Sequence, residues 1–144
     1  MRPPRIPVLI SGDKSVVYFL TFCVRNRRKV LANEATWSRI LQVQKRLDRW
    51  SFLSTLAMPD HLHMLVAPSQ DRDEKLSNMI MWFKRWFNEG RVTVWQWQDG
   101  GFDRLLRSDE SVDEKWAYIR NNPVRAQLVS NPDEWPFQIT QFRS

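Results

Sequence analysis

The first residues that suggest chemistry are two histidines, His61 and His63, which are the only histidines of the chain. In a β-strand, residues i and i+2 point to the same face. A strand that begins at His61 therefore brings both imidazoles to one point and turns Leu62 away. Imidazole nitrogens are common metal ligands. The HxH triplet thus indicates a candidate metal pair, although two unrelated polar residues at the start of a strand would show the same pattern.

A tyrosine on a polar helix is the second candidate group. Tyr118 lies in the segment KWAYIRNNP, whereas the other tyrosine, Tyr18, lies in an apolar segment and is expected in the core. Lys115 and Asn122 lie one helical turn before and after Tyr118, so the three can share a helix face. Only about one phenol in a thousand is ionised at pH 7, so nucleophilic attack needs a nearby cation or base. The alternatives are a structural tyrosine and, for Asn122, a residue that ends the helix before Pro123.

Basic and aromatic residues form a third group, suited to the phosphates and bases of DNA. A basic cluster at 25–29 follows the first apolar segment and can bind phosphates. Two tryptophans one helical turn apart, with two cations between them, can stack bases. The alternatives are a solvated loop and a helix packed on two sides. The residues predicted to contact DNA are Arg25, Arg27, Arg28, Lys29, Trp82, Lys84, Arg85, Trp86, Arg104, Arg107, Lys115 and Arg120, with Arg125 as a candidate of the same kind.

Composition limits the class of protein. The chain has 144 residues, 22 basic and 16 acidic, with a formal net charge of +6 and a pI near 10.0. A hydrophobic share of 42% is typical of one folded domain. We expect it to span 1–144, with an N-terminal arm at 1–12 and an irregular tail at 124–144. The single cysteine, Cys23, excludes a disulfide framework and is typical of a reducing compartment. Without a glycine-rich phosphate loop or a long apolar run, we expect neither a nucleotide cofactor nor a membrane partner.

The pattern of apolar residues predicts the elements that position these groups. Strands are expected at 15–24, 52–58, 61–67 and 92–98, and helices at 33–50, 76–89 and 109–121. Asn33 suits the N-cap of the first helix, and Gly90 suits the position after the second. The order is that of the split βαβ, ferredoxin-like fold, βαββαβ. We therefore predict an α+β protein with an antiparallel sheet, helices on one face, and an extra C-terminal helix that carries Tyr118.

Five segments together carry a resemblance to a known family. They are YFLTFCVRNRRKVL (18–31), MPDHLHMLV (58–66), WQDGGFDRLLR (97–107), YIRNNPVRAQLV (118–129) and EWPF (134–137), and they follow the family's order. The chain resembles the HUH single-tyrosine transposases, and among them the REP-associated tyrosine transposases. Two positions differ from many relatives, because Asn122 stands where glutamine is common and Gln127 stands where glycine is common.

The resemblance implies a metal-dependent endonuclease and strand transferase that acts on single-stranded, hairpin-forming (REP-like) DNA. It implies that His61 and His63 bind Mg²⁺ or Mn²⁺ with Asn122, whose amide oxygen suits such cations. It also implies that Tyr118 forms a 5′-phosphotyrosine intermediate during transposition. We accordingly expect a cytoplasmic, nucleoid-associated bacterial protein, present as a monomer or homodimer. Two alternatives are a non-catalytic nucleic-acid-binding module on the same sheet and a small metal-dependent hydrolase that activates water.

Overall fold

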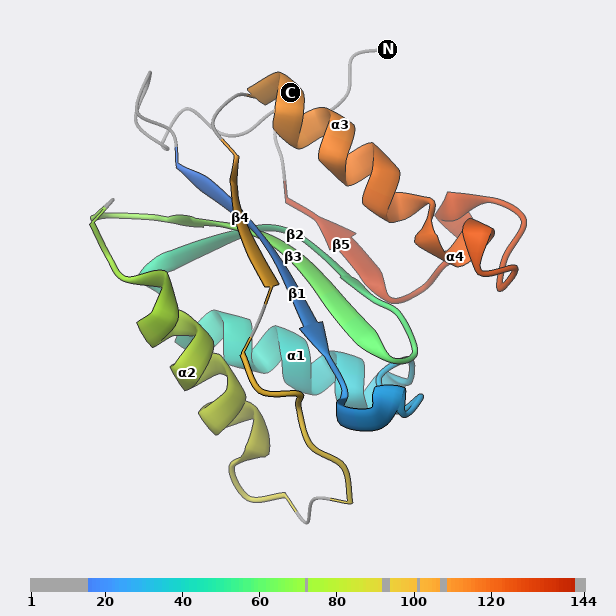
Figure 1. Cartoon of the computed structure of the whole chain (residues 1–144), viewed down its shortest axis with the longest axis horizontal. Helices are drawn as coiled ribbons and strands as arrows, with labels where there is room; N and C mark the ends of the chain where they lie inside the picture. The colour runs from blue at the N-terminus through green and yellow to red at the C-terminus, as the bar shows by residue number, and fades with distance from the viewer. Residues whose placement is uncertain (1–15, 72, 92–93, 101, 107–108, 142–144) are drawn as a thin grey trace.

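The computed structural model describes residues 16–71, 73–91, 94–100, 102–106 and 109–141, with the backbone alone at 102–106 and 109–111. The elements, drawn in Figure 1, are β1 (Val17–Cys23), η2 (Arg25–Arg27), α1 (Glu34–Arg46), β2 (Trp50–Ala57), β3 (His61–Pro68), α2 (Leu76–Asn88), β4 (Phe102–Leu106), α3 (Asp109–Arg120), α4 (Asn122–Arg125), η3 (Pro132–Glu134) and β5 (Gln138–Thr140). None of the described helices is long and apolar enough to cross a membrane.

The strands form one antiparallel sheet with the order β4-β1-β3-β2-β5. β3 is the central strand, and the short turn between β2 and β3 makes these two strands antiparallel neighbours, as predicted. The predicted α+β class, the antiparallel sheet and the C-terminal helix that carries Tyr118 are confirmed.

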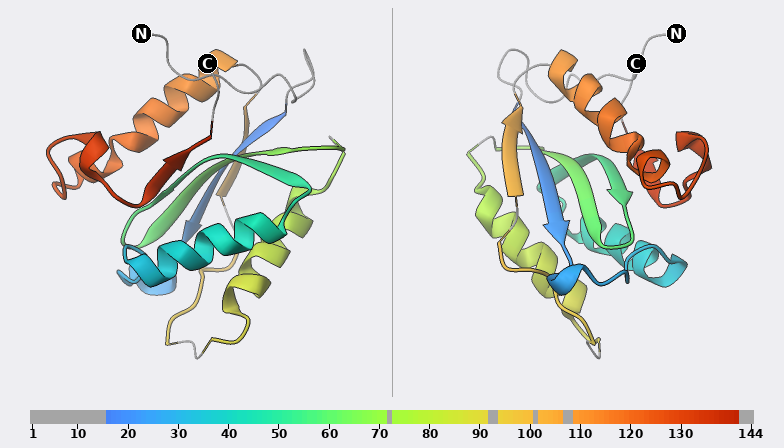
Figure 2. Two further views of the ribbon diagram at one scale, coloured as in Figure 1. Left: turned by 180° about the vertical axis from the view of Figure 1, so that it is seen from behind. Right: turned by 45° about the vertical axis from the view of Figure 1, so that its right-hand side comes forward.

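Helices cover both faces of the sheet, as Figure 2 shows: α1 and α2 lie on one face and α3 on the other. β1 divides its side chains between the two layers, because successive residues of a strand point to opposite faces. Leu20 and Phe22 pack in the core with Phe83 of α2. Phe19 packs in a second core with Trp116 of α3. Burial on both faces explains why the first apolar segment lacks a polar alternation.

α1 begins where the sequence predicts and ends earlier. The Asn33 side chain accepts a hydrogen bond from the backbone N–H of Thr36 at 2.9 Å, so it caps the helix as expected. The helix ends at Arg46, and the predicted extension to Trp50 is wrong because the chain turns at Leu47 and enters β2 at Trp50. Trp50 nevertheless lies in the same core as the apolar stripe of α1, which is why it continued the helical pattern.

The fourth strand lies further along the chain than predicted. β4 spans Phe102–Leu106 and pairs with β1, whereas the apolar run at 92–98 was expected to be this strand. Residues 92–93 lie outside the described part. Trp95 and Trp97 are buried in the core beside α1 and α2, and Trp97 makes one isolated bridge to Val24. The tryptophans made this segment resemble a strand because they fill the core next to the sheet.

The C-terminal segment is more regular than predicted. Residues 124–144 were expected to be irregular, yet they contain the second half of α4, the η3 turn and the edge strand β5, which pairs with β2. Trp135 is buried, and its Nε1 donates to the carbonyl oxygen of Ala57 at 2.9 Å. A strand as short as Gln138–Thr140 leaves too little periodicity for recognition in the sequence. The predicted arm at 1–12 lies outside the described residues.

Candidate active site

The two histidines meet at the start of the central strand. His61 opens β3, and β3 pairs with β1 so that Cys23 lies opposite His61 and Thr21 opposite His63. The centroids of the two imidazole rings are 4.7 Å apart, with the rings nearly perpendicular. Leu62 points to the other face and lies in the core beside α1 and α2. The strand geometry thus brings both rings to one point.

Each imidazole is oriented through its Nδ1 atom. His61 Nδ1 lies 2.7 Å from a carboxylate oxygen of Asp60, and His63 Nδ1 lies 3.1 Å from the hydroxyl oxygen of Thr21. Arg27 holds the other oxygen of Asp60 at 2.9 Å. Among the described residues, the Nε2 atoms have no hydrogen-bond partner. Metal-binding histidines characteristically engage their second nitrogen in this way, so the pair fits a divalent cation.

The electrostatic surroundings keep His63 neutral. Burial is the largest effect that lowers the pKa of His63 to about 3, followed by the nearby positive groups of His61, Lys115, Arg125 and Arg27. Only a neutral imidazole can bind a metal. Burial alone would raise the pKa of Asp60, but hydrogen bonds from Arg27 and His61 lower it, so this carboxylate stays charged beside the pair.

α3 places Tyr118 at the surface of the same sheet face. Val112, Trp116 and Ile119 bury one side of the helix in the second core, and Tyr118 on the other side is 60% exposed. Lys115 lies between the tyrosine and the sheet, since its Nζ is 5.5 Å from the Tyr118 ring centroid and 4.6 Å from that of Phe19.

A chain of contacts leads from Tyr118 to the histidines. The Phe19 ring, over which Lys115 lies, stacks on His63 at 5.4 Å. On the other side of Tyr118, the Arg125 guanidinium lies 4.1 Å from the ring centroid and donates to the Tyr118 carbonyl oxygen at 2.9 Å. Two cations therefore lie against the Tyr118 ring.

Asn122 is less well placed than the histidines. It opens α4 instead of ending α3, and its Oδ1 accepts a hydrogen bond from Arg125 at 3.0 Å. No described contact joins Asn122 to His61 or His63. Within the described residues, no three His, Cys, Asp or Glu side chains are grouped to hold a metal ion. Ligation by Asn122 therefore stays a prediction that requires Arg125 to release the amide oxygen.

The basic cluster lies at the end of β1, beside the histidines. Asn26 and Arg27 adopt φ angles of 61° and 52°, in the left-handed region, and this turn directs Arg27 onto Asp60 and to within 3.4 Å of His61. Arg25 pairs with Asp99 at 3.3 Å, and Arg28 donates to the carbonyl oxygen of Val94. Arg27 is thus both a candidate DNA contact and an anchor for Asp60.

The tryptophan pair lies on the opposite side of the sheet from Tyr118. Trp82 and Trp86 of α2 have ring centroids 5.1 Å apart and pack against the core beside α1 and α2. Arg85 lies 5.2 Å over Trp82, and Arg46 of α1 lies 4.1 Å over Trp86. The structure therefore does not bring these two rings to the histidines, and base stacking by them stays a prediction.

The other predicted DNA contacts are dispersed. Lys84 donates to the carbonyl oxygens of Gln98 and Gly100, so it fixes the loop before β4. Arg120 donates to Gln138 and Asp133 and ties α3 to the C-terminal segment. Arg104 lies in β4, where only the backbone is described, and Arg107 lies outside the described residues.

Three residues of the site have roles that the sequence analysis missed. Asp60 looked like a turn residue, although its position directly before the HxH triplet is a usable signal. Thr21 and Phe19 touch His63 through the pairing of β1 with β3. No local pattern reveals that pairing, because it joins segments about forty residues apart.

The chain is similar to known proteins in sequence and in fold. The chain is 25% identical over 127 residues to the REP-associated tyrosine transposase of Escherichia coli strain K12, covering 86% of this chain and 76% of the relative. A solved structure of the REP-associated tyrosine transposase bound to a REP hairpin superposes with a TM-score of 0.72 at 23% identity, covering 85% of this chain and 74% of that one.

A candidate transposase from Deinococcus radiodurans R1 superposes with a TM-score of 0.52 at 13% identity, covering 73% of this chain and 88% of that one. No family model matches. The comparisons nevertheless confirm the resemblance, since the chain is similar in sequence and in fold to REP-associated tyrosine transposases.

Proposed function

We propose that this protein cleaves and rejoins single-stranded DNA next to a hairpin, with Tyr118 as the nucleophile. One observation carries the proposal: an exposed tyrosine, flanked by Lys115 and Arg125, lies on the same sheet face as a pair of converging imidazoles. The relative whose structure is solved with a REP hairpin supports hairpin DNA as the substrate.

The chemical step is a transesterification. The Tyr118 phenol oxygen attacks the phosphorus of a phosphodiester, and the bond from phosphorus to the 3′ oxygen breaks. The leaving strand takes up a proton as a free 3′-hydroxyl, the phenol loses one, and the downstream strand remains attached through a 5′-phosphotyrosine. Attack by a 3′-hydroxyl on this bond reverses the reaction and reseals DNA. Because one phosphodiester is exchanged for another, no nucleotide cofactor is needed.

The residues around Tyr118 have separate roles in this proposed reaction. Lys115 and Arg125 would meet the negative charge of the phosphodiester that Tyr118 attacks, since cationic side chains bind phosphate oxygens. His61 and His63 would hold Mg²⁺ or Mn²⁺, with Asn122 as a possible third ligand. Such an ion polarises a phosphoryl oxygen. Asp60 and Thr21 keep the two rings oriented.

The covalent intermediate is the direct test. Hairpin-ended single strands labelled at the 3′ end are incubated with the protein and Mg²⁺ or Mn²⁺, then separated under denaturing conditions. We expect labelled protein from the wild type and none from Tyr118→Phe. Tyr18→Phe removes the hydroxyl of the other tyrosine and serves as the matched control, which retains the adduct.

The two alternatives give different results in the same assay. Cleavage that survives Tyr118→Phe would mean that water attacks and that the protein is a hydrolase. Binding without cleavage in wild-type protein would identify a nucleic-acid-binding module. Either result contradicts the proposed function.

A further inference from the structure

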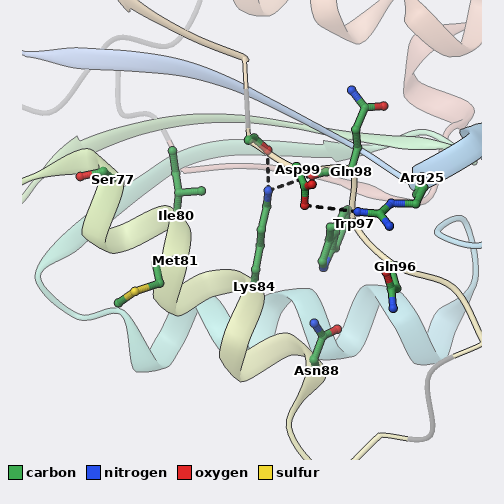
Figure 3. A pocket seen from close by; sticks show the side chains of 11 residues that line it. Arg25, Ser77, Ile80, Met81, Lys84, Asn88, Gln96, Trp97, Gln98 and Asp99 are labelled. Atoms are coloured by element: carbon green, nitrogen blue, oxygen red, sulfur yellow. Dashed lines mark hydrogen bonds and ion pairs between the residues drawn. The ribbon is translucent and has the colours of Figure 1, made fainter.

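A pocket of about 450 Å³ lies between α2 and the segment 96–100, apart from the histidines and Tyr118. Figure 3 shows residues of its walls: Asn88 projects from α2, and Gln96 and Trp97 from the facing segment. Lys84 reaches across and donates to the carbonyl oxygens of Gln98 and Gly100, so the shape of the pocket is held by hydrogen bonds.

The lining combines apolar surface with primary amides. Ile80 and Met81 supply apolar surface, and Met81 is 49% exposed at the pocket. Arg91 donates to Asn88 Oδ1 at 3.1 Å, which leaves the amide NH₂ of Asn88 available to a ligand. The side-chain amide of the exposed Gln96 offers a donor and an acceptor side by side. Adjacent donors and acceptors of this kind match the edges of nucleobases.

A buried donor in the pocket also lacks a partner. Trp97 lines the pocket and is only 5% exposed, and its Nε1 has no hydrogen-bond partner among the described residues. A buried indole N–H without a partner is costly. This N–H is enclosed in the pocket wall, so an acceptor on a bound base would reach it only if the Trp97 ring turned.

The charges of the pocket favour a base over a phosphate. Arg25 and Asp99 form an ion pair at its mouth, 3.3 Å apart, and their side chains are 47% and 97% exposed. Such an exposed pair is weak and opens readily. The Lys84 amine is committed to backbone carbonyls, and the Asp99 carboxylate repels phosphate. The exposed Arg28 and Lys29, which lie outside the pocket, are better suited to bind phosphates.

The pocket lies at the sheet end that carries the histidines. The N–H of Gln98 donates to the carbonyl oxygen of Cys23, and the N–H of Arg25 donates to that of Gln96, both at 2.8 Å. These bonds fasten the segment to the end of β1, where Cys23 lies opposite His61. A strand that passes the histidines can therefore follow the basic cluster toward the pocket.

We propose that this pocket binds one unpaired base of the DNA strand that is cleaved, and that Asn88 and Gln96 read the edge of that base. The identity of the nucleic acid rests on the proposed function. The pocket would give the enzyme a preference for one base at one fixed distance from the cleaved bond, in addition to any recognition of the hairpin.

Base-selective binding tests this proposal. Protein carrying Tyr118→Phe, which cannot cleave, is titrated with hairpin-ended strands in which an abasic site replaces each unpaired nucleotide in turn. At the most sensitive position, all four bases are then compared. We expect a preference of about five- to 150-fold between the best and worst base, the range given by one good side-chain contact to a base edge.

The double substitution Asn88→Ala with Gln96→Ala should abolish that preference and leave the affinity for the worst base unchanged. Gln70→Ala alters an exposed glutamine outside the pocket and should keep the preference. The proposed base-binding role of the pocket is overturned if the double variant retains the full base preference. It is also overturned if protein with Tyr118→Phe alone shows no position at which one base is preferred. Thermal melting of each variant verifies folding.

The outcomes separate this proposal from the proposed function. If the wild type forms the covalent adduct but binds all four bases equally at every position, only the base-binding role of the pocket is overturned. A base preference that depends on Asn88 and Gln96, in a wild-type protein that forms no adduct, supports the pocket and overturns the proposed function.

Discussion

Cations lie over aromatic rings on both faces of the sheet, but the two arrangements differ. On the α3 face, Lys115 and Arg125 flank Tyr118, the proposed nucleophile, which is largely exposed. On the α1–α2 face, Arg46 and Arg85 cover the half-buried Trp86 and Trp82, which pack against the core.

The difference lies in what surrounds each ring. Next to Tyr118, Phe19 leads to a neutral imidazole and a second imidazole beyond it. Next to Trp86, Arg46 is paired with Glu89, and the indole offers no group that attacks phosphorus. Under the proposed function, the same cation-over-ring contact therefore serves chemistry on one face and packing on the other. The following variants test that division, from the largest expected effect on catalysis to the smallest.

Removal of one imidazole should have the largest effect. His61→Ala or His63→Ala removes a proposed metal ligand, so we expect adduct formation to fall by more than about 100-fold, beyond the effect of removing a residue that only orients a ligand. DNA binding, measured by titration without metal, should change by less than about threefold, because phosphate contacts dominate affinity. Normal cleavage by both variants would mean that the histidines do not hold a catalytic metal.

Asp60→Asn should have the next largest effect, since it removes the carboxylate that orients His61. Loss of such a partner costs about 10- to 100-fold in metal affinity or activity. We expect the loss to diminish at high Mn²⁺ concentration, which the dependence of adduct formation on Mn²⁺ measures. Asp71→Asn changes an exposed acid elsewhere and should behave as wild type. An Asp60→Asn curve identical to wild type would contradict the orienting role.

Lys115→Met and Arg46→Met compare the two cation-over-ring contacts directly. Lys115→Met should slow adduct formation about two- to 30-fold, the range for a cation–π contact. Arg46→Met removes the equivalent cation from Trp86 and should leave the rate unchanged. Single-turnover rates give both values. Equal slowing by the two substitutions would break the distinction between the faces.

Salt dependence tests the basic cluster. Arg27→Ala should weaken DNA binding and flatten the plot of log affinity against log salt concentration by about one unit of slope, as expected for one lost phosphate contact. Lys29→Ala tests a cluster residue with no described partner, so it should change the slope alone and leave the rate of the bound complex intact. An unchanged slope would remove the residue concerned from the DNA-binding surface.

Trp86→Leu should have the smallest effect on catalysis. The half-buried ring packs against the core, so we expect the free energy of unfolding to fall by about 1–2 kcal/mol. The rate of adduct formation should stay within about twofold of wild type. Denaturant unfolding and the adduct assay measure the two quantities. A large drop in affinity for single-stranded DNA, without a loss of stability, would instead favour the stacking role predicted for Trp82 and Trp86.

Local patterns predicted the parts of the site that lie within one element. The i, i+2 rule was enough to bring His61 and His63 together, and helical spacing was enough to place Lys115 beside Tyr118. The N-cap at Asn33 was confirmed for the same reason, because the interaction lies within one turn.

Features that depend on strand pairing could not be predicted in this way. Thr21 reaches His63 only because β1 and β3 pair in one register. β4 was misplaced because buried tryptophans at Trp95 and Trp97 resemble a strand. The face covered by α3 and the assignment of β5 also depend on tertiary contacts. The proposed roles of the histidines and Tyr118 came from the resemblance to a family, since the residues alone favoured a structural role for the tyrosine.

The path of α3 has a mechanical consequence. In the sequence the helix follows β4, at one edge of the sheet, and precedes β5, at the other edge, and it packs against β2 and β3, the strand that carries the histidines. Two hydrogen bonds tie α3 to β5: Trp116 donates to the Thr140 hydroxyl, and Arg120 donates to the Gln138 side chain. The distance between Tyr118 and the two imidazoles therefore depends on how β5 holds α3 against the sheet, and loosening β5 is expected to shift Tyr118 relative to His61 and His63.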